Sequence, residues 1–152
     1  MEEEKIDYEQ VSLVYKEDEE YKIEKVYVKK YGNHYQIKGV PAFANNVAYN
    51  DIISVEYEDG QLFFDELIEA SGHSVVHVAI LKSENSALFF TNLILFNIGI
   101  NYLHNNLYLV IDVPKTIYYK DLRDFLIRES EIGNIDVSES CVSELHFATI
   151  KG

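Results

Sequence analysis

The tetrapeptide Ser71-Gly72-His73-Ser74 comes closer to a catalytic motif than any other part of the sequence, because it places hydroxyl groups beside an imidazole. Nucleophilic catalysis by serine needs that imidazole within hydrogen-bond reach, and a third group that orients it. Asp51 and Asp112 are the candidates for the third group. In the structural alternative, Gly72 permits a bend and the neighbouring side chains hydrogen-bond backbone groups at a junction between subdomains. We favour this structural role, and a small hydrolase that uses Ser71 and His73 is the least favoured hypothesis.

The remaining residues with catalytic or metal-binding potential are scattered along the chain. The sequence has no glycine-rich phosphate loop, and it lacks His-Glu-x-x-His, Cys-x-x-Cys and Gly-x-Ser-x-Gly motifs. Its five histidines do not show the spacing of a metal-binding set. Cys141 lies in a strand-like stretch, where a cysteine is more often a small buried apolar residue than a nucleophile. The sequence therefore predicts that the protein is not an enzyme and has no metal site or cofactor.

Acidic residues outnumber basic ones by 26 to 13, which gives a formal net charge of -13. Residues 41–80 contain seven acids and no lysine or arginine, whereas residues 21–40 contain five lysines and one acid. This balance argues against binding to nucleic acid or to an anionic membrane, because both begin with a basic surface. An acidic block without basic neighbours can attract a basic protein, although such a block can also be an ordinary solvated surface.

A β-hairpin is the clearest local prediction, because Asp59-Gly60 suits a two-residue turn in which both positions favour positive φ. A turn centred there fixes the register: Glu58 pairs with Gln61, Tyr57 with Leu62, and Val55 with Phe64. The predicted core face comprises Ile53, Val55, Tyr57, Leu62, Phe64 and Ile68, and Glu66 falls on it as an inconsistency. We expect the partner-binding site on and beside the opposite face, at Glu56, Glu58, Asp59, Phe63, Asp65 and Glu69.

The 152 residues are 47% hydrophobic, enough for a core in one domain or in two small domains. Alternating patterns predict strands at 11–15, 21–28 and 35–37, and Val40-Pro41 ends the last of them. Residues 74–81 form an apolar run typical of a central strand. After it we expect a helix that begins at Ser83 or Ser86, runs to Ile98 and is ended by Gly99. Two strands follow at 100–105 and 107–113. A second helix begins at Tyr118 and is ended by Gly133, and the last strand lies at 135–141.

This order predicts an α+β fold, in which an N-terminal antiparallel sheet or small barrel packs on a C-terminal ferredoxin-like βαββαβ half. The expected parts are an acidic segment 1–20 that can include a first strand, a β-rich subdomain 21–72 and a ferredoxin-like subdomain 73–152, which together form one compact body. The acidic start of the chain lacks the positive charge of a secretory peptide, and the single cysteine cannot form an internal disulfide. We therefore expect a cytoplasmic protein.

The predicted helix 86–98 is apolar around nearly its whole circumference, whereas a surface helix normally has one apolar stripe. It is too short to cross a bilayer. Its outer side therefore needs a cover, and the candidates are the N-terminal sheet, a second copy of the chain or a partner protein. A homodimer through this helix follows from the second option.

Three segments share a pattern with a known family: Val40-Pro41-Ala42-Phe43-Ala44 with Val47 and Asp51-Ile52-Ile53, then Ser71-Gly72-His73-Ser74, then Ile111-Asp112-Val113-Pro114. With these segments the chain resembles the bacterial domain-of-unknown-function family 4265 over residues 22–142. The resemblance implies a small cytoplasmic protein of bacteria. It implies no activity and no catalytic residues.

Three functional hypotheses follow. The first is an acidic protein-binding inhibitor, most concretely an immunity protein that occludes the active site of a basic toxin such as a nuclease. The second is a self-associating regulatory or ligand-sensing module, which rests on analogy with ferredoxin-like folds. The third is the hydrolase at Ser71 and His73. We rank the inhibitor first.

Overall fold

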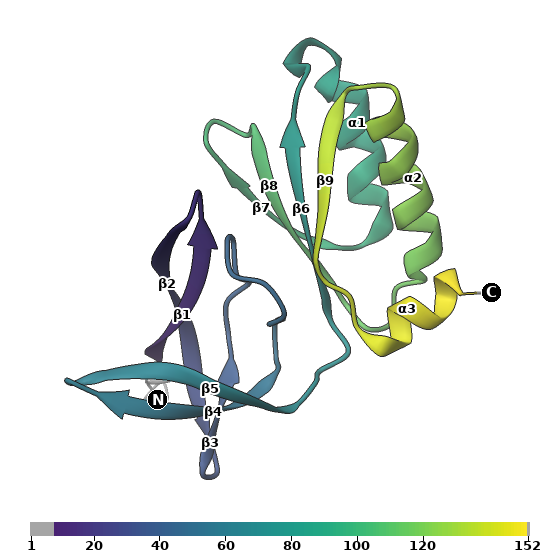
Figure 1. The fold of residues 1–152 in the computed structure, drawn as a ribbon. Coiled ribbons are helices and arrows are strands. Elements are labelled where there is room, and N and C mark those ends of the chain that lie inside the picture. The colour runs from purple at the N-terminus through teal and green to yellow at the C-terminus, as the bar shows by residue number, and fades with distance from the viewer. Residues whose placement is uncertain (1–7, 152) are drawn as a thin grey trace, which may run out of the picture. The chain divides into compact units, whose positions relative to one another are not determined.

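The computed structural model describes residues 8–151, which divide into two compact units at the bond between Ser71 and Gly72. Figure 1 shows a first unit built from strands alone and a second unit in which helices accompany a sheet. The mixed α+β class predicted from the sequence is confirmed, and so is the N-terminal barrel, which was one of two alternatives.

The first unit is a closed five-stranded barrel with the strands in sequence order. Neighbouring strands pair antiparallel, and the barrel closes through a short parallel pairing between its first and last strands. The strands are β1 (Glu9–Glu17), β2 (Glu20–Tyr31), β3 (His34–Ile37), β4 (Ile52–Glu58) and β5 (Gln61–Glu69).

Alternation along these strands places one set of apolar side chains inside the barrel. Val11, Val28, Ile37 and Ile53 are fully buried there, and Val55, Leu62 and Phe64 pack against this core from β4 and β5. The three short strands predicted at 11–15, 21–28 and 35–37 are therefore correct, although the first two extend further in the structure.

The β4–β5 hairpin has the predicted register, with Glu58 opposite Gln61 and Val55 opposite Phe64. Its turn residues Asp59 and Gly60 have φ values of 50° and 80°, as the turn type requires. Two predicted core positions are wrong: Tyr57 is 74% exposed and Ile68 is 46% exposed. Tyr57 lies beside the turn, where fewer barrel side chains can cover it, whereas Ile68 lies beyond a register shift that reverses its face.

A β-bulge explains why Glu66 does not fit the alternating pattern of the strand. The register shifts between Ser54 and Val55, so that Glu66 pairs with Ser54 and the next residue, Leu67, pairs with Ile53. An extra residue in one strand reverses the faces of the residues that follow it, here up to the second register shift between Ile53 and Ile52. Glu66 is therefore exposed, like the other acids of the hairpin.

The second unit contains a four-stranded antiparallel sheet in the order β7-β8-β6-β9. Its central strand β6 (Ser74–Ile80) is almost entirely buried, as its apolar sequence predicts. The other strands are β7 (Gly99–Leu103), β8 (Tyr108–Val113) and β9 (Ile135–Cys141), close to the predicted ranges.

Helices α1 (Ser86–Leu93) and α2 (Tyr119–Glu131) lie on the same face of this sheet (Figure 1). Their inward side chains join those of the strands in one core, to which α1 contributes Phe89 and Leu93 and α2 contributes Leu122 and Leu126. The second helix was predicted to begin at Tyr118, but α2 begins at Tyr119, which is buried, whereas Tyr118 is 54% exposed.

The helix predicted up to Ile98 is shorter in the structure. A 3-10 turn η1 (Ser83–Asn85) precedes α1, a second turn η2 (Ile94–Phe96) follows it, and Asn97 takes the left-handed conformation expected at Gly99. Asparagine tolerates this conformation better than most residues. A third helix, α3 (Glu144–Ile150), was not predicted. The Ser143 hydroxyl accepts a hydrogen bond from the N–H of His146 and so caps its N-terminus.

Candidate functional site

The acidic site predicted from the sequence lies on the β4–β5 hairpin of the barrel. The hairpin contains six acids and no lysine or arginine, and all six side chains belong to exposed residues. Phe63 lies directly opposite Glu56 across the two strands, with Ser12 of β1 on its other side. The structure thus places the five predicted acids on one ribbon, together with Glu66, which was not among the predicted site residues. We call this ribbon the acidic hairpin and define it by its six acids: Glu56, Glu58, Asp59, Asp65, Glu66 and Glu69.

Among residues 8–151, no lysine or arginine forms an ion pair with any acid of the acidic hairpin. The ion pairs of the barrel lie elsewhere, between Lys16 and Glu19 and between Lys22 and Glu17 of the first hairpin. Asp65 accepts a hydrogen bond of 3.1 Å from the neutral hydroxyl of Ser54. Six negative charges on one short ribbon therefore act on the solvent side with no cation beside them within the described residues, which produces a local negative potential.

Two aromatic residues accompany these charges, and they differ from the prediction. Phe63 was expected to be the exposed anchor of the site but is half-buried against the barrel. Tyr57, which was expected in the core, is the exposed aromatic of the hairpin. Tyrosine combines a large apolar surface with a hydroxyl, a combination that is enriched in protein-binding sites. The position of Tyr57 beside the Asp59-Gly60 turn, where the core ends, was the feature of the sequence that could have predicted its exposure.

A hollow of about 340 Å³ lies beside Tyr57 at one end of the barrel, where Glu9, Ser12, Lys25 and Gln61 also contribute to its wall. Lys25 pairs with Ser12 in the β1–β2 ladder, so one cation stands two strands away from the acidic hairpin. The lining of this hollow is therefore mixed in charge, unlike the hairpin itself.

The Ser71-Gly72-His73-Ser74 turn uses its polar side chains for local contacts. The Ser71 hydroxyl donates to the backbone carbonyl of Tyr49 over 2.7 Å, and the Ser71 N–H donates to Asp51. His73 Nδ1 lies 2.8 Å from Asp112 Oδ1, so Asp112 is the residue that orients this imidazole. The single hydroxyl hydrogen of Ser71 points to a carbonyl, whereas a nucleophilic serine gives that hydrogen to its base.

Ser74 and His146 form a second serine–histidine pair that the sequence did not reveal. Ser74 Oγ lies 2.6 Å from His146 Nδ1, and His146 Nε2 lies 3.0 Å from the carbonyl oxygen of Pro114. Since a carbonyl only accepts, Nε2 carries the hydrogen and Nδ1 accepts from the serine hydroxyl, which in turn accepts from the N–H of Ser143. Both residues are essentially inaccessible, so this pair joins α3 to the sheet and offers no nucleophile.

Burial lowers the pKa of His146 below the ordinary value of an imidazole, and the nearby His73 adds to this effect, while the Pro114 carbonyl and Asp112 oppose it. The neutral ring, which satisfies both hydrogen bonds with its hydrogen on Nε2, is thus the form that its surroundings favour. Next to it, the buried Tyr119 donates to Glu139, which also accepts from Arg123. Burial and the Glu139 carboxylate raise the pKa of Tyr119 well above its usual range, so this hydroxyl stays protonated.

Glu24 holds a loop that the sequence analysis singled out. Its carboxylate accepts hydrogen bonds from the N–H groups of Ala42, Phe43 and Ala44 at 2.7, 3.0 and 3.0 Å, and the Phe43 ring stacks on Tyr15.

A family model described as "Domain of unknown function (DUF4265)" matches residues 24–137 and therefore includes this loop, the acidic hairpin and the Ser-Gly-His-Ser turn. The chain belongs to this DUF4265 family. The resemblance inferred from the sequence is confirmed.

This DUF4265 protein is also similar to a solved structure, a protein of Neisseria gonorrhoeae described as hypothetical. The two chains share 28% sequence identity with a TM-score of 0.82, and the match covers 90% of this chain and 96% of the other. No curated protein matches. Within residues 8–151, no cluster of three or more histidine, cysteine or acidic side chains could hold a metal ion, and no helix is long and apolar enough to span a membrane.

Proposed function

We propose that this DUF4265 protein is a protein-binding inhibitor that captures a basic partner on its acidic hairpin, and most concretely an immunity protein for a basic bacterial toxin of the nuclease type. The observation that carries the proposal is the set of six exposed acids without an ion-paired cation among residues 8–151. Tyr57 supplies the exposed aromatic surface within this set. We propose that the protein works in the cytoplasm as a binding protein and not as an enzyme.

The chemistry of a nuclease explains why an acidic ribbon would inhibit it. A nuclease active site must attract phosphates, so it carries lysine, arginine or bound cations. Carboxylates spaced along a strand can occupy such a site and exclude the substrate. Complementary potentials also raise the rate of encounter, by up to about a thousandfold over a neutral pair. Because both strands of the hairpin are paired within the barrel, little backbone freedom would be lost on binding, which adds affinity.

The test uses the full chain and a basic toxin encoded by a neighbouring gene. In the reversal variant, Glu56, Glu58, Asp65 and Glu69 are changed to Lys, and we expect it to lose both binding and inhibition of the toxin. The matched control changes four exposed acids outside the hairpin to Lys, namely Glu20, Glu84, Glu131 and Asp136. Because both variants alter net charge equally, equal losses in both would overturn the assignment of the site.

A second candidate function is self-association through the region of α1, and a specific observation favours it. Leu88, Ile94 and Leu95 are 69%, 57% and 73% exposed, although leucine and isoleucine are residues that cores normally bury. Sedimentation of the purified chain at micromolar and millimolar concentrations tests this candidate. A monomer throughout that range would eliminate it.

We also infer that the second unit is ferredoxin-like, as predicted. The sheet order β7-β8-β6-β9, its antiparallel pairing, and the helices between β6 and β7 and between β8 and β9 support this assignment. Its consequence for the proposed function is limited, since the acidic hairpin belongs to the first unit. An experimental structure of residues 72–152 compared with known folds would test it.

A further inference from the structure

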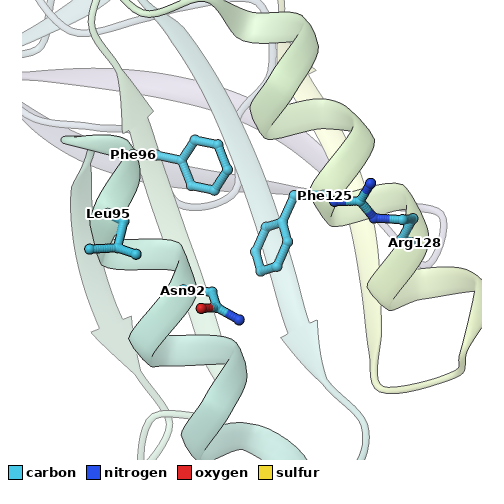
Figure 2. A pocket seen from close by; sticks show the side chains of 5 residues that line it. All are labelled: Asn92, Leu95, Phe96, Phe125 and Arg128. Carbon is cyan, nitrogen blue, oxygen red and sulfur yellow. The ribbon is translucent and has the colours of Figure 1, made fainter.

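A pocket of about 320 Å³ lies between α1 with η2 and the adjacent helix α2 in the second unit (Figure 2). Asn92, Leu95 and Phe96 line it from the first side, and Phe125 and Arg128 line it from α2. The volume lies at the lower end of the range for small-molecule sites. None of these residues belongs to the acidic hairpin, so the pocket is independent of the proposed inhibitor function, although Leu95 also belongs to the candidate self-association surface.

The apolar wall of the pocket consists of rings that are held in place. Phe125 is 8% exposed, and its ring stacks on Phe89 at 5.6 Å with an interplanar angle of 9°. The ring of Phe96 lies 5.5 Å from Phe125 at an angle of 33°. Figure 2 shows Phe96 and Asn92 projecting toward α2, with Phe125 facing them. An apolar group entering here would meet a fixed cluster of rings, of which Phe96 is the more accessible, with the exposed Leu95 beside it.

The polar part of the lining consists of Arg128 and Asn92. Arg128 follows Phe125 by three residues on α2 and therefore lies on the same side of that helix. The other cations of this helix are engaged, since Lys120 pairs with Asp124 at 2.7 Å and Arg123 with Glu139 at 3.0 Å. Within residues 8–151, Arg128 has no carboxylate oxygen within 4.0 Å, and the side-chain amide of Asn92 has no hydrogen-bond partner.

We propose that this pocket binds a small organic acid whose body is aromatic and whose carboxylate pairs with Arg128. The fixed rings provide the apolar surface, the guanidinium provides a planar donor pair that matches a carboxylate, and the Asn92 amide provides a further donor. The pocket therefore selects an acid over a neutral analogue.

The experiment titrates the full chain with 3-phenylpropionate and with its neutral analogue 3-phenylpropanol, and follows the backbone amide shifts by NMR. We expect the acid to shift the signals of Asn92, Phe96, Phe125 and Arg128, and to bind more tightly than the alcohol. Arg128→Gln should weaken binding of the acid roughly threefold to fivefold and leave binding of the alcohol unchanged. Lys120→Gln is the matched control, because it removes one positive charge from the same helix and should change neither.

Asn92→Leu keeps the number and branching of the side-chain heavy atoms and removes the amide, so it should weaken binding of the acid alone. The proposal is overturned if acid and alcohol bind equally, if Arg128→Gln binds the acid as well as the original chain does, or if 10 mM acid shifts none of the pocket signals. It is also overturned if the same signals move with protein concentration in the absence of ligand, because a second copy of the chain would then be the occupant.

Discussion

The acidic hairpin and the Ser74–His146 pair both consist of polar residues of the types found in functional sites. They differ in exposure and in whether their polar groups have partners. The six acids of the hairpin are exposed and have no ion-paired cation among residues 8–151. The serine and histidine are buried, and each of their polar atoms has a hydrogen-bond partner. This difference indicates which residues stabilise the fold and which can bind a partner. Polar groups that hydrogen-bond within the protein stabilise the fold, whereas charges without partners are available to another molecule.

The most severe test of this comparison removes the buried imidazole. His146→Ala should lower the free energy of unfolding by about 3–5 kcal/mol, because it creates a cavity and leaves the Ser74 hydroxyl and the Pro114 carbonyl without their partner. Urea unfolding measures the change, with Ser138→Ala on an exposed position of β9 as the control. A loss below about 1 kcal/mol would show that the pair does not hold α3 to the sheet.

A second test compares two carboxylates of the barrel. Glu24→Gln should cost about 1.5–3 kcal/mol of stability, because the charged acceptor of three backbone N–H groups becomes neutral. Glu56→Gln should change stability by less than about 0.5 kcal/mol, because Glu56 is exposed and has no such partners. Thermal unfolding of both variants side by side gives the answer, and similar losses would contradict the distinction between structural and available acids.

A third test concerns Tyr57, the exposed aromatic of the hairpin. Tyr57→Ala should weaken binding to a basic partner about tenfold while changing stability little, because 74% of the residue is exposed. Calorimetric titration measures the affinity, and Tyr21→Ala is the control, since Tyr21 is 77% exposed in the first hairpin. If Tyr21→Ala weakens binding as much as Tyr57→Ala, the binding surface has been placed on the wrong hairpin.

The smallest effect expected is a pH dependence that originates at His146. Since burial lowers the pKa of His146 in the folded state, the unfolded state binds the proton first as the pH falls below 6.5. The contribution of the neutral imidazole to the free energy of unfolding should therefore be fully present above pH 6.5. It should decrease as the pH falls, by at most about 1.4 kcal/mol per pH unit, until the pH is below the lowered pKa of the folded state. Subtracting the unfolding profile of His146→Gln isolates this contribution, and an identical profile in both proteins would contradict it.

The sequence predicted the strands and the β4–β5 register well because these depend on local patterns. Alternation and the Asp59-Gly60 turn are properties of a few neighbouring residues, and they identify strands and pairing without knowledge of the rest of the chain. The bulge that turns Glu66 outward could not be foreseen, because it depends on how the strands curve to close a barrel.

The sequence predicted the exposed acids of the candidate site but not its exposed aromatic residue. Charge is a property of composition, so the acidic hairpin could be read directly from residues 41–80. The exposure of a residue at the end of a hairpin depends on where the core stops, which the local pattern does not show. Phe63 is therefore half-buried where exposure was expected, and Tyr57 is exposed where burial was expected. The partner of Ser74 was equally out of reach, since His146 is 72 residues away and belongs to a helix that the sequence analysis missed.

The salt dependence of association tests the central claim most directly. Stopped-flow mixing of the full chain with its basic partner between 20 and 500 mM NaCl should give a rate constant that falls steeply with salt, because screening shortens the reach of the hairpin charges. Reversal of Glu56, Glu58, Asp65 and Glu69 to Lys should remove this dependence, while reversal of Glu20, Glu84, Glu131 and Asp136 should leave most of it. A rate constant that does not change with salt in the unaltered protein would contradict the role assigned to the acidic hairpin.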